Sequence, residues 1–170
     1  MKINLFQRVL IFLAATTGVL WTGSYTLRLL LTYGMFEQAG VEFKYFINDE
    51  NLSALMQVTG ISVTTTFFLY LAFILLFFLT LLIIRPPLRK NGWLFMILVI
   101  VLVTLPFELY LMTFDYDIIT EFLTPGFNTE YITNIFRKRY STLQGFSFGI
   151  ILCYISIIYL AIFKPFSTKD

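Results

Sequence analysis

The sequence predicts an all-α integral membrane protein, a four-helix bundle whose two long connections lie on one side of the membrane. Three observations lead to this prediction. The 170-residue chain is 58% apolar and 13% charged, whereas an average soluble domain has about 25% charged residues. The run 61–84 contains no charged residue and is long enough to cross a hydrocarbon core of ~30 Å. A second long apolar run, 93–114, follows after a short polar connection.

The short connection 85–92 sets the arrangement of the two central helices. Pro86 ends the first helix at Arg85, because proline lacks a backbone N–H and pushes the preceding residue out of the helical region. So short a turn makes the two helices antiparallel neighbours. The turn carries three basic residues, which place it on the cytoplasmic side by the positive-inside rule.

Two further crossings are expected at 9–33 and 141–163, within a single membrane domain that covers 1–170. The run 9–33 follows basic residues, as the apolar region of a signal peptide does. It is too long for such a region, so we interpret it as an uncleaved first helix. The run 141–163 is the fourth crossing, and a short charged tail follows it.

The two long connections, 34–60 and 115–140, are both acidic. Asn48 or Asp49 can cap a short helix in the first connection, and Asn128 can cap one in the second. Apolar residues follow at the spacing of one helix face, namely Leu52, Leu55 and Met56 in the first and Tyr131, Ile132, Ile135 and Phe136 in the second. We expect both short helices to lie at the membrane interface.

Basic residues decide the predicted orientation. Four crossings place both termini and the turn 85–92 on one side. That side carries Lys2, Arg8, Arg85, Arg89, Lys90, Lys164 and Lys169, and the side of the long connections carries Lys44, Arg137, Lys138 and Arg139. Seven basic residues against four favour cytoplasmic termini. We expect a cytoplasm-facing membrane such as the bacterial inner membrane.

The amino-acid composition also excludes several kinds of functional site. The chain has no histidine, which excludes histidine-ligated haem and triads built on imidazole. A single cysteine, Cys153, excludes an intrachain disulfide. A net charge of +2 is too small to indicate a nucleic-acid partner. We expect no cofactor, no metal and no nucleic acid, and the lipid bilayer as the main environment.

Two ionisable residues, Arg28 and Glu108, lie within the predicted crossings. Helix rise places Arg28 ~28 Å and Glu108 ~22 Å from the inner boundary, both in the outer third of the core. An arginine side chain can span that difference, so the two form a candidate intramembrane charge pair that gates a path or binds a proton or cation. The structural alternative is that Arg28 snorkels to the interface while Glu108 is hydrogen-bonded within the bundle.

Small residues at every fourth position mark two candidate helix-packing seams. One seam consists of Ser141, Gly145, Gly149 and Cys153 and includes a G-x-x-x-G, and the other consists of Ala14, Gly18 and Thr22. Such seams let helices approach closely in lipid. Either the two helices pack on each other, or the last helix docks on a second protein.

A cluster of three basic residues, Arg137, Lys138 and Arg139, precedes the last crossing. It can contact lipid headgroups or an acidic partner. The second crossing carries phenylalanine on every side, and a helix that is apolar all round does not line an aqueous path.

These observations favour a non-catalytic accessory, assembly or interaction subunit of a larger membrane complex, with another membrane protein or a second copy as its partner. The alternative is a small transporter or channel subunit that acts as an oligomer through Glu108 and Arg28. An enzyme is disfavoured, because neither histidine nor a convergent carboxylate pair is found within the crossings.

Overall fold

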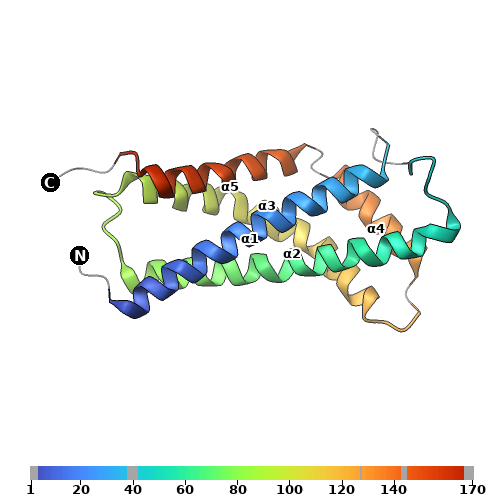
Figure 1. Cartoon of the computed structure of the whole chain (residues 1–170), viewed down its shortest axis with the longest axis horizontal. Coiled ribbons are helices and arrows are strands. Elements are labelled where there is room, and N and C mark those ends of the chain that lie inside the picture. The colour runs from blue at the N-terminus through green and yellow to red at the C-terminus, as the bar shows by residue number, and fades with distance from the viewer. Residues whose placement is uncertain (1–3, 38–41, 127, 143–144, 167–170) are drawn as a thin grey trace.

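The computed structural model describes residues 4–37, 42–126, 128–142 and 145–166. Within these ranges the chain forms five helices and one isolated antiparallel bridge, between Phe36 and Phe43. The helices are α1 (Leu5–Met35), α2 (Asp49–Ile84), α3 (Gly92–Phe122), α4 (Thr129–Ser141) and α5 (Phe146–Phe163). The four long helices run along the long axis of the molecule, and the short α4 lies at one end of the bundle (Figure 1).

Helices α1, α2, α3 and α5 are long and apolar enough to cross a membrane. The prediction of an all-α chain with four candidate membrane spans is therefore confirmed. With its 36 residues, α2 measures ~54 Å at ~1.5 Å per residue. This length exceeds a hydrocarbon core of ~30 Å, so α2 is longer than an upright crossing requires.

The N-terminal part of α2 is the segment expected to form a separate interfacial helix. Asn48 does cap a helix, through a box in which Asn48 and Asn51 each accept a hydrogen bond from the other's backbone N–H. However, the helix continues without a break to Ile84. Gly60, within this stretch, does not end the helix. It leaves room for the Phe122 ring, which would clash with a Cβ atom at Gly60.

Helix α3 is also longer than expected. It continues through Asp115 to Phe122, although these residues were predicted to belong to the connection 115–140. The chain then turns at Thr124, Pro125 and Gly126, and Gly126 has a φ of 75°. Residues 115–122 are therefore helical and extend the same face of α3.

The expected crossing 141–163 is divided between two helices. Ser141 is the last residue of α4, and Gly145 is the N-cap of α5 with a φ of 86°. This left-handed conformation is one that glycine adopts without steric cost. The chain changes direction here, so α4 and α5 are separate helices (Figure 1).

Aromatic side chains fill the middle of the bundle. Trp21 of α1 is 1% exposed, and its ring centroid lies 4.9 Å from that of Tyr70 in α2 and 4.4 Å from that of Tyr154 in α5. Val101 of α3, fully buried, belongs to the same cluster. All four long helices therefore contribute to one core.

A second buried cluster lies between the ends of α2 and α3 and helix α4. It contains Met56 and Val63 from α2 and Ile118 from α3. Ile132, Ile135 and Phe136 of α4 are buried in it, as their spacing predicted, but Tyr131 is 48% exposed. The apolar face of α4 is thus covered by the ends of α2 and α3.

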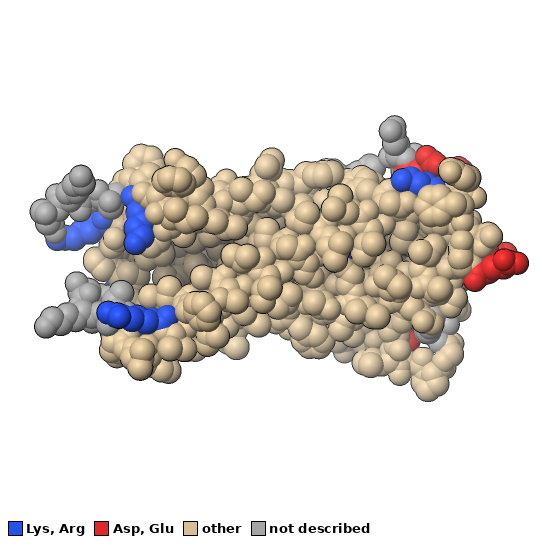
Figure 2. Space-filling model, in the orientation of Figure 1, with Lys and Arg blue, Asp and Glu red and all other residues tan. Residues whose placement is uncertain are grey.

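Charged residues gather at the two ends of the molecule (Figure 2). The end where α1 begins and α5 ends carries exposed basic residues, among them Arg8, Arg85, Arg89, Lys90 and Lys164. The opposite end carries exposed acidic residues, among them Asp49, Glu50, Asp117 and Glu130. The surface between the ends is free of charge on the face shown.

Candidate functional site

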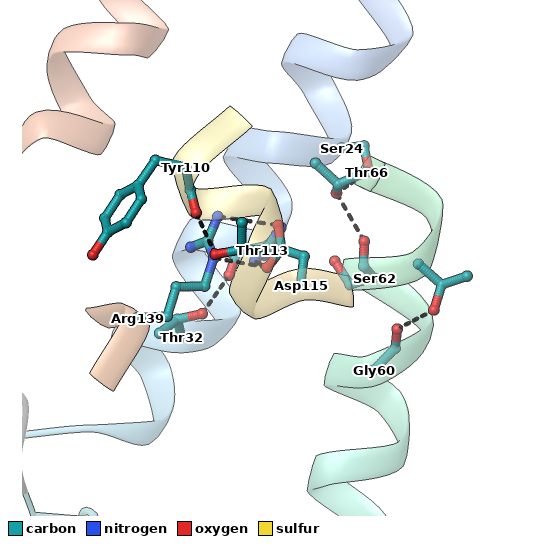
Figure 3. A network of polar contacts seen from close by, with 11 residues as sticks. Ser24, Thr32, Gly60, Ser62, Thr66, Tyr110, Thr113, Asp115 and Arg139 are labelled. Atoms are coloured by element: carbon teal, nitrogen blue, oxygen red, sulfur yellow. Dashed lines mark hydrogen bonds and ion pairs between the residues drawn. The ribbon is translucent and has the colours of Figure 1, made fainter. Parts of the chain in front are cut away.

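One carboxylate, that of Asp115 in α3, lies between two guanidinium groups. Arg28 of α1 donates from Nη1 to Oδ2 over 2.9 Å and from Nη2 to Oδ1. Arg139 of α4 has its Nε 2.7 Å from Oδ1, and its Nη2 donates to Oδ2 over 3.4 Å. Figure 3 shows Arg139 and Asp115 facing each other between α4 and α3. Asp115 therefore connects three helices.

These charges are almost completely removed from the surface. Arg28 is 3% exposed and Asp115 is 2% exposed, and the side chain of Arg139 is 12% exposed. Burial disfavours the charge on Arg139, but Asp115, together with Tyr25 and Glu108, offsets this effect and raises the pKa of the guanidinium above its ordinary value. Arg139 thus stays charged, and loss of Asp115 would leave two buried guanidinium groups without their ion-pair partner.

Helix periodicity brings these side chains together. Tyr25, Arg28 and Thr32 lie at positions i, i+3 and i+7 of α1, and all three are buried. Glu108 and Asp115 are likewise seven residues apart on the buried face of α3. Because α3 continues past residue 114, Asp115 lies two turns beyond Glu108, ~10 Å farther along the same face.

Arg28 pairs with Asp115 rather than with Glu108, which differs from the pair that the sequence suggested. The reason is the length of α3, since Asp115 becomes a helical residue at the depth that Arg28 reaches. Arg28 and Glu108 still interact electrostatically. The described side chains form no ion pair between these two residues.

Glu108 is 3% exposed, and its Oε1 has no hydrogen-bond partner among the described residues. Its neighbours include Arg139 and the Tyr25 side chain, with which it interacts electrostatically. The Tyr25 hydroxyl also lacks a hydrogen-bond partner in the described part of the chain. Two buried polar groups therefore lie close enough to interact.

A cavity of about 20 Å³ lies beside the two arginines. Its lining comprises Tyr25, Arg28, Leu29, Thr32, Tyr33, Phe136, Arg139, Tyr140, Gly145 and Ser147. This volume is enough for about one water molecule. Burial and the neighbouring Tyr33 raise the pKa of Tyr140 to about 12, so its hydroxyl keeps its proton. Glu108 does not line this cavity, whereas Tyr25 does.

The basic cluster 137–139 is divided among three different environments. Arg139 is held by Asp115, and Arg137 lies over the Phe43 ring at 5.2 Å from its centroid. Lys138 is exposed and lies 5.7 Å from the centroid of the Phe114 ring. The three side chains therefore do not form one surface, and Arg139 is not free to contact a headgroup.

The small-residue seam of α1 faces α2. Ala14 is 7% exposed, and a Cβ atom at Gly18 would lie 2.9 Å from Cε2 of Phe73. Thr22 donates its hydroxyl proton to the Gly18 carbonyl over 2.8 Å. This seam is filled within the bundle.

The seam of the last crossing is interrupted. Ser141 ends α4, Gly145 lies in the turn, and Gly149 and Cys153 belong to α5. The four residues do not share one helix face, although they are four positions apart in the sequence. A Cβ atom at Gly149 would meet no described atom within 4 Å.

The site combines carboxylate, guanidinium and phenol groups, so the chemistry that it can support is ion pairing and proton exchange. No group of three or more His, Cys, Asp or Glu side chains in the described ranges is placed to hold a metal ion. Arg28, Glu108 and Arg139 were predicted from the sequence as candidate residues, whereas Asp115 and Tyr25 were not predicted as members of the site. Their i, i+3 and i, i+7 spacing from Arg28 and Glu108 was the available signal.

Comparison of the chain with protein-family models, with curated proteins and with solved structures found no match.

Proposed function

We propose that this protein is a non-catalytic accessory or assembly subunit that packs one face of α5 against another membrane protein. The observation that supports this most directly is the open environment of Gly149. A Cβ atom there would meet no described atom within 4 Å. Cys153 and Ser156 follow at i+4 and i+7, and Gly149 and Ser156 are exposed. In lipid, small residues at this spacing allow a second helix to approach closely.

The contrast with α1 supports this assignment. The small residues of α1 lie against Phe73 within the same chain, as the 2.9 Å distance at Gly18 shows. The α5 face of Gly149 receives no such side chain from the described residues. Phe148, Leu152 and Ile155 are at least half exposed beside it. A facing helix would fill the groove at Gly149 and pack against these bulky neighbours.

Transport by an oligomer through Glu108 and Arg28 is less well supported. Arg28 is engaged with Asp115, and Glu108 does not line the cavity beside it. That cavity, at about 20 Å³, is far smaller than an ordinary small-molecule site, which has several hundred Å³. Beyond Glu108 the bundle interior is filled by side chains that include Val101, which is fully buried, and Trp21, which is 1% exposed.

The distribution of charged residues between the two ends of the bundle supports an orientation of the protein in the membrane, which is part of the proposal. The end of the bundle that contains the 85–92 connection carries exposed basic residues, namely Arg85, Arg89 and Lys164. We infer that this end faces the cytoplasm, in a membrane such as the bacterial inner membrane. The acidic end with α4 would then face away from the cytoplasm.

The decisive experiment is native mass spectrometry of the protein extracted from its own membrane in a mild detergent. Wild type is compared with Gly149→Leu and with the control Gly23→Leu, since Gly23 is an exposed helical glycine of α1 that also has open space around it. We expect a stoichiometric second polypeptide with wild type and with Gly23→Leu. Gly149→Leu should lose it.

Two other results would change the conclusion. A pure homo-oligomer that Gly149→Leu dissociates would mean that the partner is a second copy, and it would revive the transport alternative. A wild-type protein that remains monomeric in its native membrane extract would refute the proposal.

A further inference from the structure

Three polar atoms in the middle of the bundle have no hydrogen-bond partner among the described residues. They are Oε1 of Glu108, the hydroxyl oxygen of Tyr25 and the hydroxyl oxygen of Tyr70. The three residues are 3%, 3% and 1% exposed, and they come from α3, α1 and α2. Buried polar groups in proteins are almost always paired. The two phenols carry their own protons, whereas an ionised carboxylate only accepts hydrogen bonds, so a proton is the smallest ligand that would supply what Oε1 of Glu108 lacks.

Charged and titratable groups surround Glu108 from every helix. It interacts electrostatically with Tyr25 and Arg28 of α1, Tyr70 of α2, Arg139 of α4 and Tyr154 of α5, and with Asp115 on α3 itself. Both arginines bind Asp115 directly. With Glu108 ionised, the two carboxylates and two guanidinium groups sum to zero charge, and with Glu108 protonated they sum to +1. Glu108 can therefore be ionised or protonated without a large net charge on the cluster, as a site that exchanges a proton requires.

A cavity lies on one side of this cluster. The cavity of about 20 Å³ beside Arg28 and Arg139 reaches the exposed residue Gly145 and has room for about one water molecule. Tyr25 lines this cavity and also interacts with Glu108. Arg28 and Arg139 also line the cavity and interact with Glu108, and Tyr25 is the hydroxyl-bearing side chain that does so.

Access from the other side is closed. Beyond Glu108 the bundle is filled by Trp21, whose ring centroid lies 4.4 Å from that of Tyr154, and by Val101, which is fully buried. Tyr154 accepts a hydrogen bond from the Thr104 hydroxyl at 3.5 Å. These side chains leave the cavity end as the route for a proton.

We propose that Glu108 is a buried proton-exchanging site, reached through the cavity beside Arg28 and Arg139 and through the Tyr25 hydroxyl. A hydronium ion in the cavity gives a proton to the Tyr25 oxygen while the phenolic proton of Tyr25 passes to Oε1 of Glu108. One O–H bond breaks and one forms at Tyr25, which ends unchanged, and Glu108 gains one proton. This inference stands independently of the partner proposed for α5.

Infrared difference spectroscopy of the full chain in lipid nanodiscs tests the site during a pH titration. Glutamate labelled with ¹³C in its carboxyl group identifies the carbonyl band of protonated glutamic acid. We expect a band that titrates and exchanges slowly with deuterium, because Glu108 is buried. Exposed glutamates such as Glu37, Glu50 and Glu130 exchange at once. Glu108→Gln should remove the slow band, and the control Asp117→Asn, an exposed acid of the same helix, should keep it.

Tyr25→Phe tests the route. It removes the hydroxyl and keeps the ring, so the slow band should remain while its deuterium exchange slows by an order of magnitude. If labelled wild type shows no slowly exchanging glutamic acid band at any pH at which the protein stays folded, the site is refuted, whether or not Glu108→Gln folds. If Tyr25→Phe exchanges as fast as wild type, the route through Tyr25 is refuted.

Discussion

At the scale of single residues, Asp115 has the largest structural role among the charged side chains. Its two oxygens bind both Arg28 and Arg139, and all three side chains are nearly or largely buried. Two cations therefore depend on a single carboxylate. Removing one partner of a buried ion pair costs about 3–5 kcal/mol, because the remaining charge is left in a low-dielectric environment.

Replacing Asp115 by Asn is expected to lower the free energy of unfolding by about 3–5 kcal/mol, since it leaves both arginines buried without a counter-ion. Asp117→Asn, two residues along the same helix but exposed, should change it by less than about 0.5 kcal/mol. Thermal unfolding in detergent, followed by tryptophan fluorescence, measures both variants. Equal stabilities of the two variants would show that the Asp115 ion pairs make no net contribution.

The glycines of α1 provide a second test at this scale. Gly18→Leu places a side chain where Phe73 already lies 2.9 Å from the Cβ position, and we expect a loss of about 1–3 kcal/mol from this overpacking. Gly23→Leu has open space and should not lower stability. The same unfolding measurement compares them. A stable Gly18→Leu protein would mean that α1 and α2 can separate at no cost.

At the scale of elements, α4 is the one described helix that is not among the four candidate membrane spans. Its apolar face covers the ends of α2 and α3, and Arg139 ties it to Asp115. Asn128 accepts a hydrogen bond from the Tyr131 backbone N–H at its N-terminus. With only 13 residues, α4 would be marginal as an isolated helix, so these contacts with its neighbours stabilise it.

Arg139→Met should therefore loosen α4 selectively. Amides of α4 are expected to exchange with deuterium faster in this variant, whereas those in the buried middle of α2 should be unchanged, because Arg28 still holds Asp115. Lys138→Met, at the exposed neighbouring position, is the control. Hydrogen exchange read by mass spectrometry gives the result. Uniform acceleration across all helices would indicate global destabilisation instead.

At the scale of the whole molecule, the two ends differ in charge and in construction. One end consists of a short basic connection and helix termini, and the other consists of the ends of long helices, α4 and acidic residues (Figure 2). An uncharged surface separates the ends on the face shown. The excess of Lys and Arg in the short connection and termini at one end is the kind of bias that orients a chain during membrane insertion.

Cysteine labelling on intact cells tests the proposed orientation. In a Cys153→Ala background, Glu50→Cys at the acidic end should react with a membrane-impermeant maleimide. Arg89→Cys at the basic end should react only after the membrane is permeabilised. Both native residues are exposed, so burial does not confound the comparison. The reverse pattern would invert the orientation.

Much of the fold follows from local sequence patterns. The uncharged run 61–84, the stop at Pro86 and the caps at Asn48 and Asn128 predict helices from features a few residues apart. Four candidate spans and an all-α chain could be predicted for this reason. Helix ends were less predictable, because α2 and α3 continue into acidic segments whose composition is that of a connection.

The candidate site was only partly predictable, and the reason is distance along the chain. Arg28 and Glu108 stand out because a charge inside an apolar run is costly, and that cost can be recognised from the sequence. The partner of Arg28 is 87 positions away, and choosing Asp115 over Glu108 depends on where α3 ends and how α1 crosses it. Likewise, the open space at Gly149 and the filled space at Gly18 follow from the arrangement of neighbouring helices. Local composition thus sets which segments enter the membrane, whereas long-range helix packing sets which charges meet and which face stays open.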